Sequence, residues 1–222
     1  MDALPFGFAD ALSDRGTARR LDRGELLIVA GDTDTDAFLV TDGRFRVSLL
    51  SRTGREPLLA EVGAGSLIGE LAAIDSQSRS ATVTAVTPAS VVRIDAATFR
   101  ELLLSRPEWT LWLLRALSAR SRSMTGRHLE FATLSVNGRV LAEVARLTAF
   151  GERDGDHAML EDFPTHEDLA ARIGTQREAV TRALRALARS GVIKQQRRRL
   201  EVLSIDTLHA RLEAEGGEVP NG

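Results

Sequence analysis

The chain has no cysteine and no long uninterrupted apolar run. Without cysteine, no disulfide, thiolate-ligated iron–sulfur cluster or sulfur-based zinc finger can form, and redox sensing through thiols is excluded. No stretch approaches the roughly 18–20 apolar residues that a membrane-spanning helix needs. The N-terminal segment carries acids where a signal peptide would carry positive charge. These absences predict a cytoplasmic protein that does not span a membrane.

The net charge is small, but the charges are distributed unevenly. The chain carries 29 basic and 31 acidic residues, a formal net charge of −2. The segment Arg172–Arg199 contains nine basic residues and one acid, and the preceding Glu152–Asp168 contains seven acids and one arginine. The local excess of positive charge is typical of a surface that binds a polyanion such as nucleic acid.

The first half of the sequence has the pattern of a β-rich domain. Short runs of β-branched and aliphatic residues alternate with glycine-containing turns, which predicts a roll or small sandwich. In the run that begins at Phe45, apolar residues alternate with Arg46 and Ser48, so one face should be buried and the other solvated. The expected strands are Leu26–Val29, Ala37–Val40, Phe45–Leu50, Leu58–Val62, Ala81–Val86 and Ser90–Ile94.

After the β region, the spacing at which apolar residues recur changes from two residues to about 3.6 residues, which predicts helices. Asp95 can cap a helix that runs through Leu103, and Pro107 stands in the first turn of a second helix of about 27 residues, about 40 Å long. Apolar residues recur along this second helix at alternating spacings of four and three, a heptad seam interrupted by two arginines. The seam consists of Leu113, Leu117, Arg120, Met124, Arg127, Phe131 and Leu134.

Two interpretations of the long helix are open. It can pair with the same helix of a second copy, or it can pack on its own β domain. Its length exceeds what so small a domain needs for its own cover, which favours a homodimer.

The second half has the layout of a helix-turn-helix. An apolar stripe runs from Val140 to Leu147, and an acidic loop, Gly151–Asp156, follows. Two short helices, Glu167–Ile173 and Gln176–Arg189, are joined by a tight turn at Gly174. Their predicted internal core consists of Leu169, Ala170, Ile173, Val180, Leu184 and Leu187.

The remaining side chains of the second helix are candidates for reading DNA. Arginine forms bidentate contacts with guanine, and glutamate accepts from cytosine N4. The alternative is a solvated helix with a Glu178–Arg182 ion pair, which the basic excess argues against. Two strands around a basic turn follow, a wing whose cations would hold phosphates. The candidate DNA-binding residues are Thr175, Gln176, Arg177, Glu178, Thr181, Arg182 and Arg185, with Lys194, Arg197 and Arg198 on the wing.

A second motif lies within the β region. Gly69, which lacks a Cβ, lets backbone amides approach an anion, and Glu70 begins a short helical turn. Arg79 can supply a fork of donors to two phosphate oxygens, and the Ser80 hydroxyl can add a third contact. Glu70, an acceptor when ionised, suits a ribose hydroxyl.

In order and context, these residues resemble the phosphate-binding cassette of cyclic-nucleotide-binding domains. The resemblance implies that Glu70 binds the 2′-hydroxyl, that Arg79 binds the cyclic phosphate, and that amides after the glycine complete the contacts. It places the ligand site at Gly69, Glu70, Leu71, Ala72, Arg79 and Ser80, with Met124 and Thr125 on the long helix.

Over about residues 8–205 the chain resembles the catabolite activator protein (cyclic AMP receptor) family. The family's recognition-helix pattern, Arg-Glu-x-x-x-Arg, falls on Arg177, Glu178 and Arg182. The resemblance implies a homodimer that binds double-stranded DNA at a palindrome with TGTGA-like half-sites, with cyclic AMP as allosteric effector and RNA polymerase as a partner.

One departure concerns the effector. Where the activator has two adjacent hydroxyl residues for the adenine, this chain has Met124 and Thr125. Ser80 can serve a guanine, as in cyclic-GMP-selective relatives, so cyclic GMP is the alternative effector. A ligand-independent regulator with a vestigial pocket is a further alternative. A haem or iron–sulfur sensor is disfavoured by the absence of cysteine and the scattered histidines, and an enzyme by the absence of a nucleophile–base pair or metal constellation.

The predicted fold class is α+β: a β-roll for cyclic nucleotides, a long dimerisation helix and a winged helix-turn-helix. The expected boundaries are 1–106 for the roll, 107–135 for the helix and hinge, 136–215 for the DNA-binding domain and 216–222 for a disordered tail.

Overall fold

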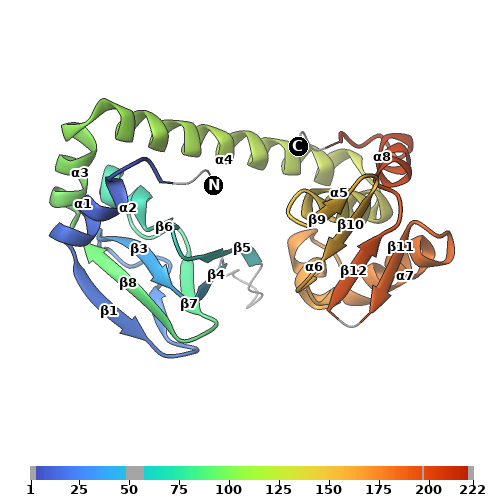
Figure 1. The fold of residues 1–222 in the computed structure, drawn as a ribbon, viewed down its shortest axis with the longest axis horizontal. Coiled ribbons are helices and arrows are strands. Elements are labelled where there is room, and N and C mark those ends of the chain that lie inside the picture. The colour runs from blue at the N-terminus through green and yellow to red at the C-terminus, as the bar shows by residue number, and fades with distance from the viewer. Residues whose placement is uncertain (1–3, 49–57, 197, 220–222) are drawn as a thin grey trace. The chain divides into compact units, whose positions relative to one another are not determined.

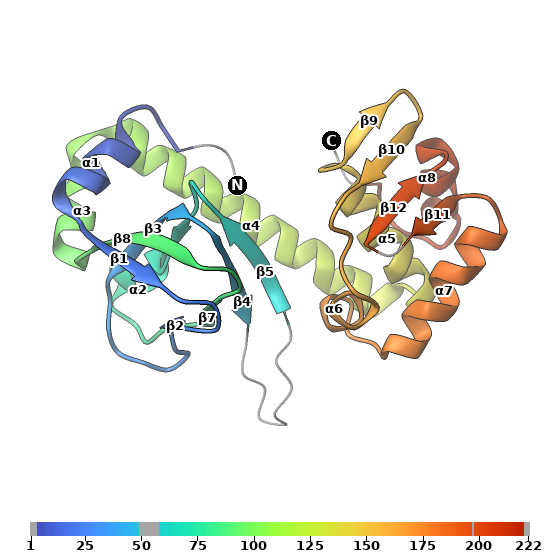
Figure 2. The same ribbon diagram turned by 60° about the horizontal axis from the view of Figure 1, so that its bottom comes forward.

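The computed structural model describes residues 4–48, 58–196 and 198–219. Contacts divide the chain into two compact units that meet in sequence between Arg122 and Ser123. The first unit consists of β-sheets covered by helices, and the second of helices around a smaller sheet (Figures 1 and 2). The predicted α+β class is therefore confirmed.

Two antiparallel sheets form the framework of the first unit. Their strands are β1 (Thr17–Leu21), β2 (Leu26–Ile28), β3 (Ala37–Asp42), β4 (Arg44–Ser48), β5 (Leu58–Gly63), β6 (Leu67–Ile68), β7 (Thr82–Ala85) and β8 (Ala89–Ile94). One sheet has the strand order β1-β8-β3-β6 and the other β2-β7-β4-β5. Phe38, Phe45 and Val91 are among the buried side chains that the two sheets contribute to a common core. The sheets thus form the predicted small sandwich.

Helices bury the other face of the β1-β8-β3-β6 sheet. They are α1 (Phe8–Arg15), α2 (Glu70–Asp75), α3 (Ala96–Ser105) and the first turns of α4 (Pro107–Thr133). In β3, Leu39 packs with these helices, whereas Phe38 belongs to the core between the sheets. The Phe8 ring of α1 lies 4.8 Å from the Trp109 ring of α4. Strand β3 is therefore buried on both faces, as its unbroken apolar run requires.

The predicted helix boundaries around residue 107 are confirmed. The Asp95 side chain accepts a hydrogen bond from the Thr98 amide at 2.9 Å, and α4 begins at Pro107 and spans 27 residues. Trp109, Trp112 and Leu113 of α4 are buried in the core of the first unit. The start of α4 therefore packs on its own β domain, which is the alternative interpretation of the long helix. Leu113, which the sequence pattern assigned to the seam, is buried in this packing.

The second unit contains a helix-turn-helix whose interior was predicted correctly. Its helices are α5 (Val136–Thr148), α6 (His166–Arg172), α7 (Arg177–Arg189) and α8 (Ile205–Ala214), and its strands are β9 (Glu152–Asp154), β10 (His157–Leu160), β11 (Ile193–Gln196) and β12 (Arg199–Val202). The sheet order is β11-β12-β10-β9, so β11 and β12 form the predicted wing. The six residues predicted as internal core are all buried: Leu169, Ala170, Ile173, Val180, Leu184 and Leu187.

The turn between α6 and α7 depends on glycine. Gly174 has φ +63°, and a Cβ at this position would lie 2.7 Å from Cε1 of Phe131. Both the left-handed conformation and the contact with the end of α4 therefore require the absence of a side chain.

Two predicted features of the apolar pattern were wrong. Ser48 is only 4% exposed rather than solvated, because the pairing of β4 with β5 shifts register between Val47 and Ser48, and such a bulge interrupts the alternation of faces. Leu134 follows the end of α4 and is buried in the core of the second unit, so it is not part of a seam on that helix.

The acidic segment predicted as a loop is a β-hairpin. Asp154 pairs with His157, which leaves the two-residue turn Gly155-Asp156, and Gly155 has φ +58°. The hairpin was missed because β9 is exposed along its whole length and shows no apolar alternation. Helices α1 and α8 and strands β1 and β6 were also not predicted.

Some predicted features lie outside the described residues. They include the end of the run Phe45–Leu50 and the last part of the tail, residues 220–222. The start of the tail is described, and the Gly217 amide donates to the Leu212 carbonyl at 2.9 Å.

Candidate functional site

A cavity of about 130 Å³ lies within the first unit beside α2. All six residues that the cassette resemblance placed in the β domain line it: Gly69, Glu70, Leu71, Ala72, Arg79 and Ser80. Strand residues such as Val47, Val62 and Val83 form its apolar wall. The lining residues run from Ile28 to Arg120, 92 positions apart in sequence, and they meet the cassette at one place. Their roles in binding stay predictions.

Gly69 sets the geometry of the cassette. It has φ +79° and precedes α2 as its N-terminal cap. A Cβ at this position would lie 2.6 Å from Nη1 of Arg79 and 2.8 Å from the carbonyl oxygen of Asp36. The close approach of Arg79 to this turn therefore depends on glycine.

Arg79 is almost fully buried and is held by oxygen acceptors. Only 4% of it is exposed, and its Nη1 donates to the Gly69 carbonyl at 3.1 Å. Its Nη2 donates to the Asp36 carbonyl at 2.7 Å. Nε and Nη2 together form a bidentate pair with the Asp34 carboxylate, at 3.0 and 2.5 Å. The guanidinium is thus already oriented, with its Nη1 side next to Gly69.

The Asp34 contact was not foreseen from the sequence. The segment Asp32-Thr33-Asp34-Thr35-Asp36 is rich in acids, which was the available signal, but its proximity to Arg79 is a long-range contact. Burial alone would raise the pKa of Asp34. The hydrogen bonds from Arg79 and from the Asp36 amide, with the charges of Arg79 and Arg93, outweigh burial and lower this pKa.

Glu70 is the second buried charge of the cavity. It is 5% exposed, and its Oε1 accepts a hydrogen bond from Nη1 of Arg120 at 2.6 Å. Arg120 lies on α4 and also lines the cavity, although the sequence pattern assigned it only to the seam. Within the described part of the chain, Oε2 of Glu70 has no hydrogen-bond partner, so this oxygen can accept from a ligand hydroxyl.

Met124 and Thr125 lie on α4 beyond Arg122, in the second unit. Met124 is 66% exposed. Their predicted contact with the ligand base stays a prediction.

The outward face of α7 carries cations without internal partners. Gln176, Arg177, Glu178, Arg182 and Arg185 are exposed, and Thr181 is half-buried. Among the described residues, none forms an ion pair with the guanidinium groups of α7 on this face, and the alternative Glu178–Arg182 pair does not form. This face is therefore free to contact an anion.

The wing cations, by contrast, have acidic neighbours. Lys194 lies 3.8 Å from Glu201, and Arg198 lies 3.8 Å from Asp162. Both pairs are exposed and separated by more than a hydrogen-bond distance, so they hold these cations weakly. Arg197, the third wing residue predicted to contact DNA, lies outside the described residues.

One arginine of the basic segment has an internal role. Arg172 is close to the buried carboxylate of Glu143, at 3.4 Å, and Arg146 also pairs with Glu143. Arg146 in turn pairs with Glu130 of α4 at 2.5 Å. The count of basic residues in the sequence therefore overstates the charge available to DNA, because it includes Arg172.

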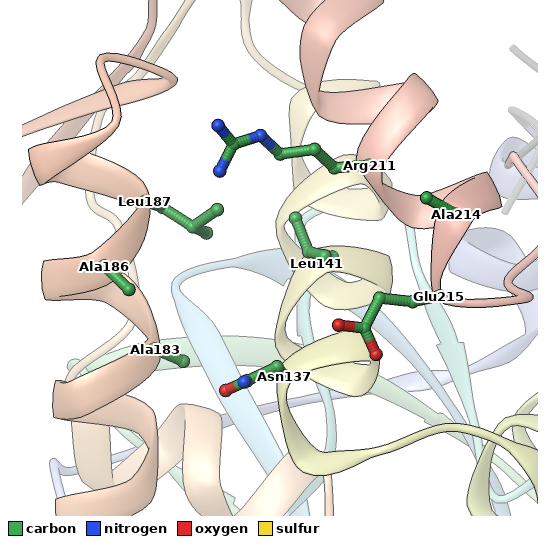
Figure 3. Close-up of a pocket in the computed structure, with 8 residues that line it drawn as sticks. All are labelled: Asn137, Leu141, Ala183, Ala186, Leu187, Arg211, Ala214 and Glu215. Atoms are coloured by element: carbon green, nitrogen blue, oxygen red, sulfur yellow. The ribbon is translucent and has the colours of Figure 1, made fainter.

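A larger hollow of about 320 Å³ lies between α5, α7 and α8 (Figure 3). Its floor is apolar, with Leu141 and Leu187. At its rim Arg211 donates to the Ser190 hydroxyl at 2.8 Å, and Glu215 accepts from the Ser135 hydroxyl at 2.7 Å. Its charged groups are thus engaged by the protein itself, and none of the predicted site residues lines it.

No described group of three or more His, Cys, Asp or Glu side chains could hold a metal ion. No described helix is long and apolar enough to cross a membrane.

Comparisons with known proteins agree with the two-unit organisation. Residues 18–106 match the model of the cyclic nucleotide-binding domain, and residues 138–211 match the Crp-like helix-turn-helix domain.

Relatives match along most of the chain. The cyclic AMP receptor protein of Thermus thermophilus is 32% identical over 176 residues, which cover 78% of this chain and 77% of that protein. The CRP-like cAMP-activated global transcriptional regulator of Mycobacterium tuberculosis is 28% identical, covering 78% and 77%. The structure of a CooA variant from Carboxydothermus hydrogenoformans has a TM-score of 0.83 at 17% identity, covering 96% and 97%, and supports the fold.

A cyclic nucleotide-binding domain followed by a helix-turn-helix defines a class of DNA-binding transcription regulators rather than enzymes. Within this class, the chain belongs to the catabolite activator protein, or cyclic AMP receptor protein (Crp-Fnr), family. The predicted membership is confirmed, as is the general function of a cyclic-nucleotide-binding transcription regulator.

The Asp34–Arg79 pair makes the stability of the first unit depend on pH. The pKa of Asp34 in the folded protein is lower than its usual 3.8. The ionised Asp34 therefore stabilises the folded protein above that pH, and this stabilisation is lost as the pH falls through the pKa of Asp34 in the folded protein. We expect the unfolding free energy of the wild type to fall more steeply below about pH 4 than that of Asp34→Asn. Both tryptophans lie in the first unit, so denaturant titrations followed by tryptophan fluorescence measure this difference. Parallel pH profiles for the two proteins would contradict it.

Proposed function

We propose that the protein is a homodimeric regulator that cyclic AMP activates allosterically for binding to a palindromic, TGTGA-like DNA site. The observation that carries the proposal is the shared cavity of Arg79 and Glu70, one buried cation and one buried anion with an unpartnered oxygen. The exposed, unpaired arginines of α7 support the DNA-binding half of the proposal.

In this proposal the cavity binds the sugar-phosphate ring of the nucleotide. Arg79 contacts the cyclic phosphate, Glu70 accepts from the 2′-hydroxyl, and amides at the start of α2, of Leu71 and Ala72, add donors. Thr125 retains one hydroxyl for the adenine, and Met124 packs on the base. The Thermus and Mycobacterium relatives are named as a cyclic AMP receptor and a cAMP-activated regulator, which supports this effector.

Two alternatives have specific support. Ser80 lines the cavity next to Arg79, a position from which a hydroxyl can serve a guanine, so cyclic GMP is the second candidate effector. The cavity is smaller than the roughly 300 Å³ or more of common ligand sites, and Asp34 already neutralises Arg79. These two features favour a ligand-independent regulator with a vestigial pocket.

For DNA binding, we propose that some side chains of α7 contact bases and that the wing contacts phosphates. Arg177, Glu178 and Arg182 contact base edges in the major groove, as the family's recognition pattern implies. The remaining candidates contact phosphates and set the register of the protein on the duplex: Thr175, Gln176, Thr181, Arg185, Lys194, Arg197 and Arg198.

The homodimer is proposed to form along α4. Beyond its buried start, α4 carries large apolar side chains of the predicted seam that the chain itself leaves exposed, with Met124 66% and Phe131 45% exposed. A row of such side chains on one helix is typical of an interface. Ligand binding would then favour the dimer state in which both recognition helices fit successive turns of DNA.

Other expectations from the sequence are also proposals. The exposed acids of the β9–β10 hairpin, Glu152 and Asp154, are candidates for contact with RNA polymerase. The site of action is proposed to be the cytoplasm. The domain boundaries are proposed as 1–106, 107–135 and 136–215.

Calorimetric titration with cyclic AMP and cyclic GMP tests the ligand site. We expect Arg79→Ala and Glu70→Ala each to lower nucleotide affinity at least about tenfold, since a hydrogen bond to a charged group contributes roughly 1.5–3 kcal/mol. The exposed Arg44 of β4 does not line the cavity, so Arg44→Ala is the matched control and should bind like the wild type. Unchanged affinity in the cavity variants would end the cassette assignment. Absence of any binding by the wild type would favour the ligand-independent alternative.

Binding to a palindromic duplex and to a series of single-base variants tests the reading of bases. We expect Arg177→Ala to cost about 1–3 kcal/mol and to relax the preference at one base pair. Arg198→Ala, on the wing, should weaken binding to all sequences alike and reduce the salt dependence. Equal effects of the two variants on specificity would contradict the proposed division.

Sedimentation of two α4 variants tests the dimer interface. Met124 belongs to the predicted seam, whereas Leu129 is exposed on a different side of the same helix. We expect Met124→Asp to shift the protein toward the monomer, because a charge would be buried at the seam, and Leu129→Asp to leave the dimer intact. The reverse order of effects would place the interface on the other face.

A further inference from the structure

Three polar side chains from three elements meet beside α7. They are His166, the first residue of α6; Thr181, on α7; and Gln195, on β11 of the wing. Nδ1 of His166 lies 2.8 Å from the Thr181 hydroxyl, and its Nε2 lies 3.0 Å from the amide nitrogen of Gln195. Thr181 is one of the proposed phosphate contacts, whereas His166 and Gln195 have no role in the function described so far.

These hydrogen bonds have one consistent direction. The Gln195 amide nitrogen can only donate, and it lies closer to Nε2 of His166 than the amide oxygen does, which is at 3.4 Å. Nε2 therefore accepts, and the ring proton of a neutral imidazole is on Nδ1, which donates to the Thr181 hydroxyl. The Thr181 hydroxyl donates in turn to the backbone carbonyl of Arg177 at 2.9 Å. An unbroken chain of donors thus runs from the wing to the first turn of α7.

The cluster adds a polar attachment between the wing and α7. The end of α7 connects to the start of β11 through a turn at Gly191, where φ is +72°, and Ile193 at the start of β11 packs in the same core as Leu184 of α7. Gln195 lies near the opposite end of β11, and Thr181 lies in the first half of α7. The hydrogen bonds therefore attach the far end of β11 to α7, in addition to the turn and the apolar core at its start.

We propose that His166 is a positioning residue that holds the wing and the recognition helix in one fixed geometry. It acts as a neutral imidazole with its proton on Nδ1. The inference rests on the proposed role of α7 in reading DNA, and it assigns to His166 no contact with DNA. Supporting side chains of this kind keep contact residues in place, because each member of a hydrogen-bonded chain orients the next.

Nuclear magnetic resonance tests the chain without DNA. We expect the ¹⁵N signals of His166 to show a neutral ring protonated on Nδ1. Gln195→Ala should shift the amide signals of Thr181 and Arg177, and should cease to do so when His166→Ala is also present. Gln196→Ala, an exposed neighbour on the same strand, is the control and should leave these signals in place. A ring protonated on Nε2, or shifts that persist without His166, would overturn the proposal.

DNA binding tests its consequence. The probes are a palindromic TGTGA duplex and a scrambled duplex, with cyclic AMP present and at fixed salt. We expect His166→Ala and Gln195→Ala each to lower the preference for the palindrome about two- to tenfold, the range of one net hydrogen bond, and the double variant to lower it no further. Thermal unfolding should show that all variants remain folded.

The outcomes distinguish the proposed reading of bases from the positioning role of His166. If the wild type shows no preference for the palindrome, the proposed base reading fails, whereas the resonance experiment still decides the role of His166. If the wild type shows the preference and the two single effects add in the double variant, the positioning role is wrong.

Discussion

The buried guanidinium of Arg79 is the constraint on which the first unit's site depends. A cation removed from water must be surrounded by oxygen acceptors, and the Gly69 and Asp36 carbonyls and the Asp34 carboxylate supply them. The requirement for glycine at position 69 follows from this, because a Cβ there would lie 2.6 Å from Nη1 of Arg79. The position of Glu70, the next residue, follows in turn. The cavity is therefore a consequence of how one charge is accommodated.

In the second unit, burial decides what each arginine does. Arg172 and Arg146 face the buried carboxylate of Glu143, and they stabilise the packing of α5 with its neighbours. Among the described residues, no buried acid pairs with the arginines on the outer face of α7. The same residue type therefore serves the interior at some positions and leaves charge for an external anion at others. A linear count of charge does not separate these two cases, whereas the contacts do.

The sequence predicted those elements whose side chains alternate between solvent and core. Strands such as β7, the long helix and the interior of the helix-turn-helix were found in this way, whereas β3 was found from its unbroken apolar run. Strand β1 is exposed at four of its five positions and β9 at all three, so neither carries such a signal. The cassette residues were recognised as a local motif, but Asp34 and Arg120 were not. They reach the cassette from 45 and 50 positions away along the chain, and no local pattern encodes such a contact.

The end of α4 is joined to the second unit by more than the chain. Phe131 packs against Gly174, and Glu130 pairs with Arg146. Ser135, the second residue after α4, caps α5 by accepting a hydrogen bond from the Gly138 amide. The segment between α4 and α5 is therefore not a free joint. Within α4, Gly126 lies just before these contacts, and glycine lowers the cost of distorting a helix at its position.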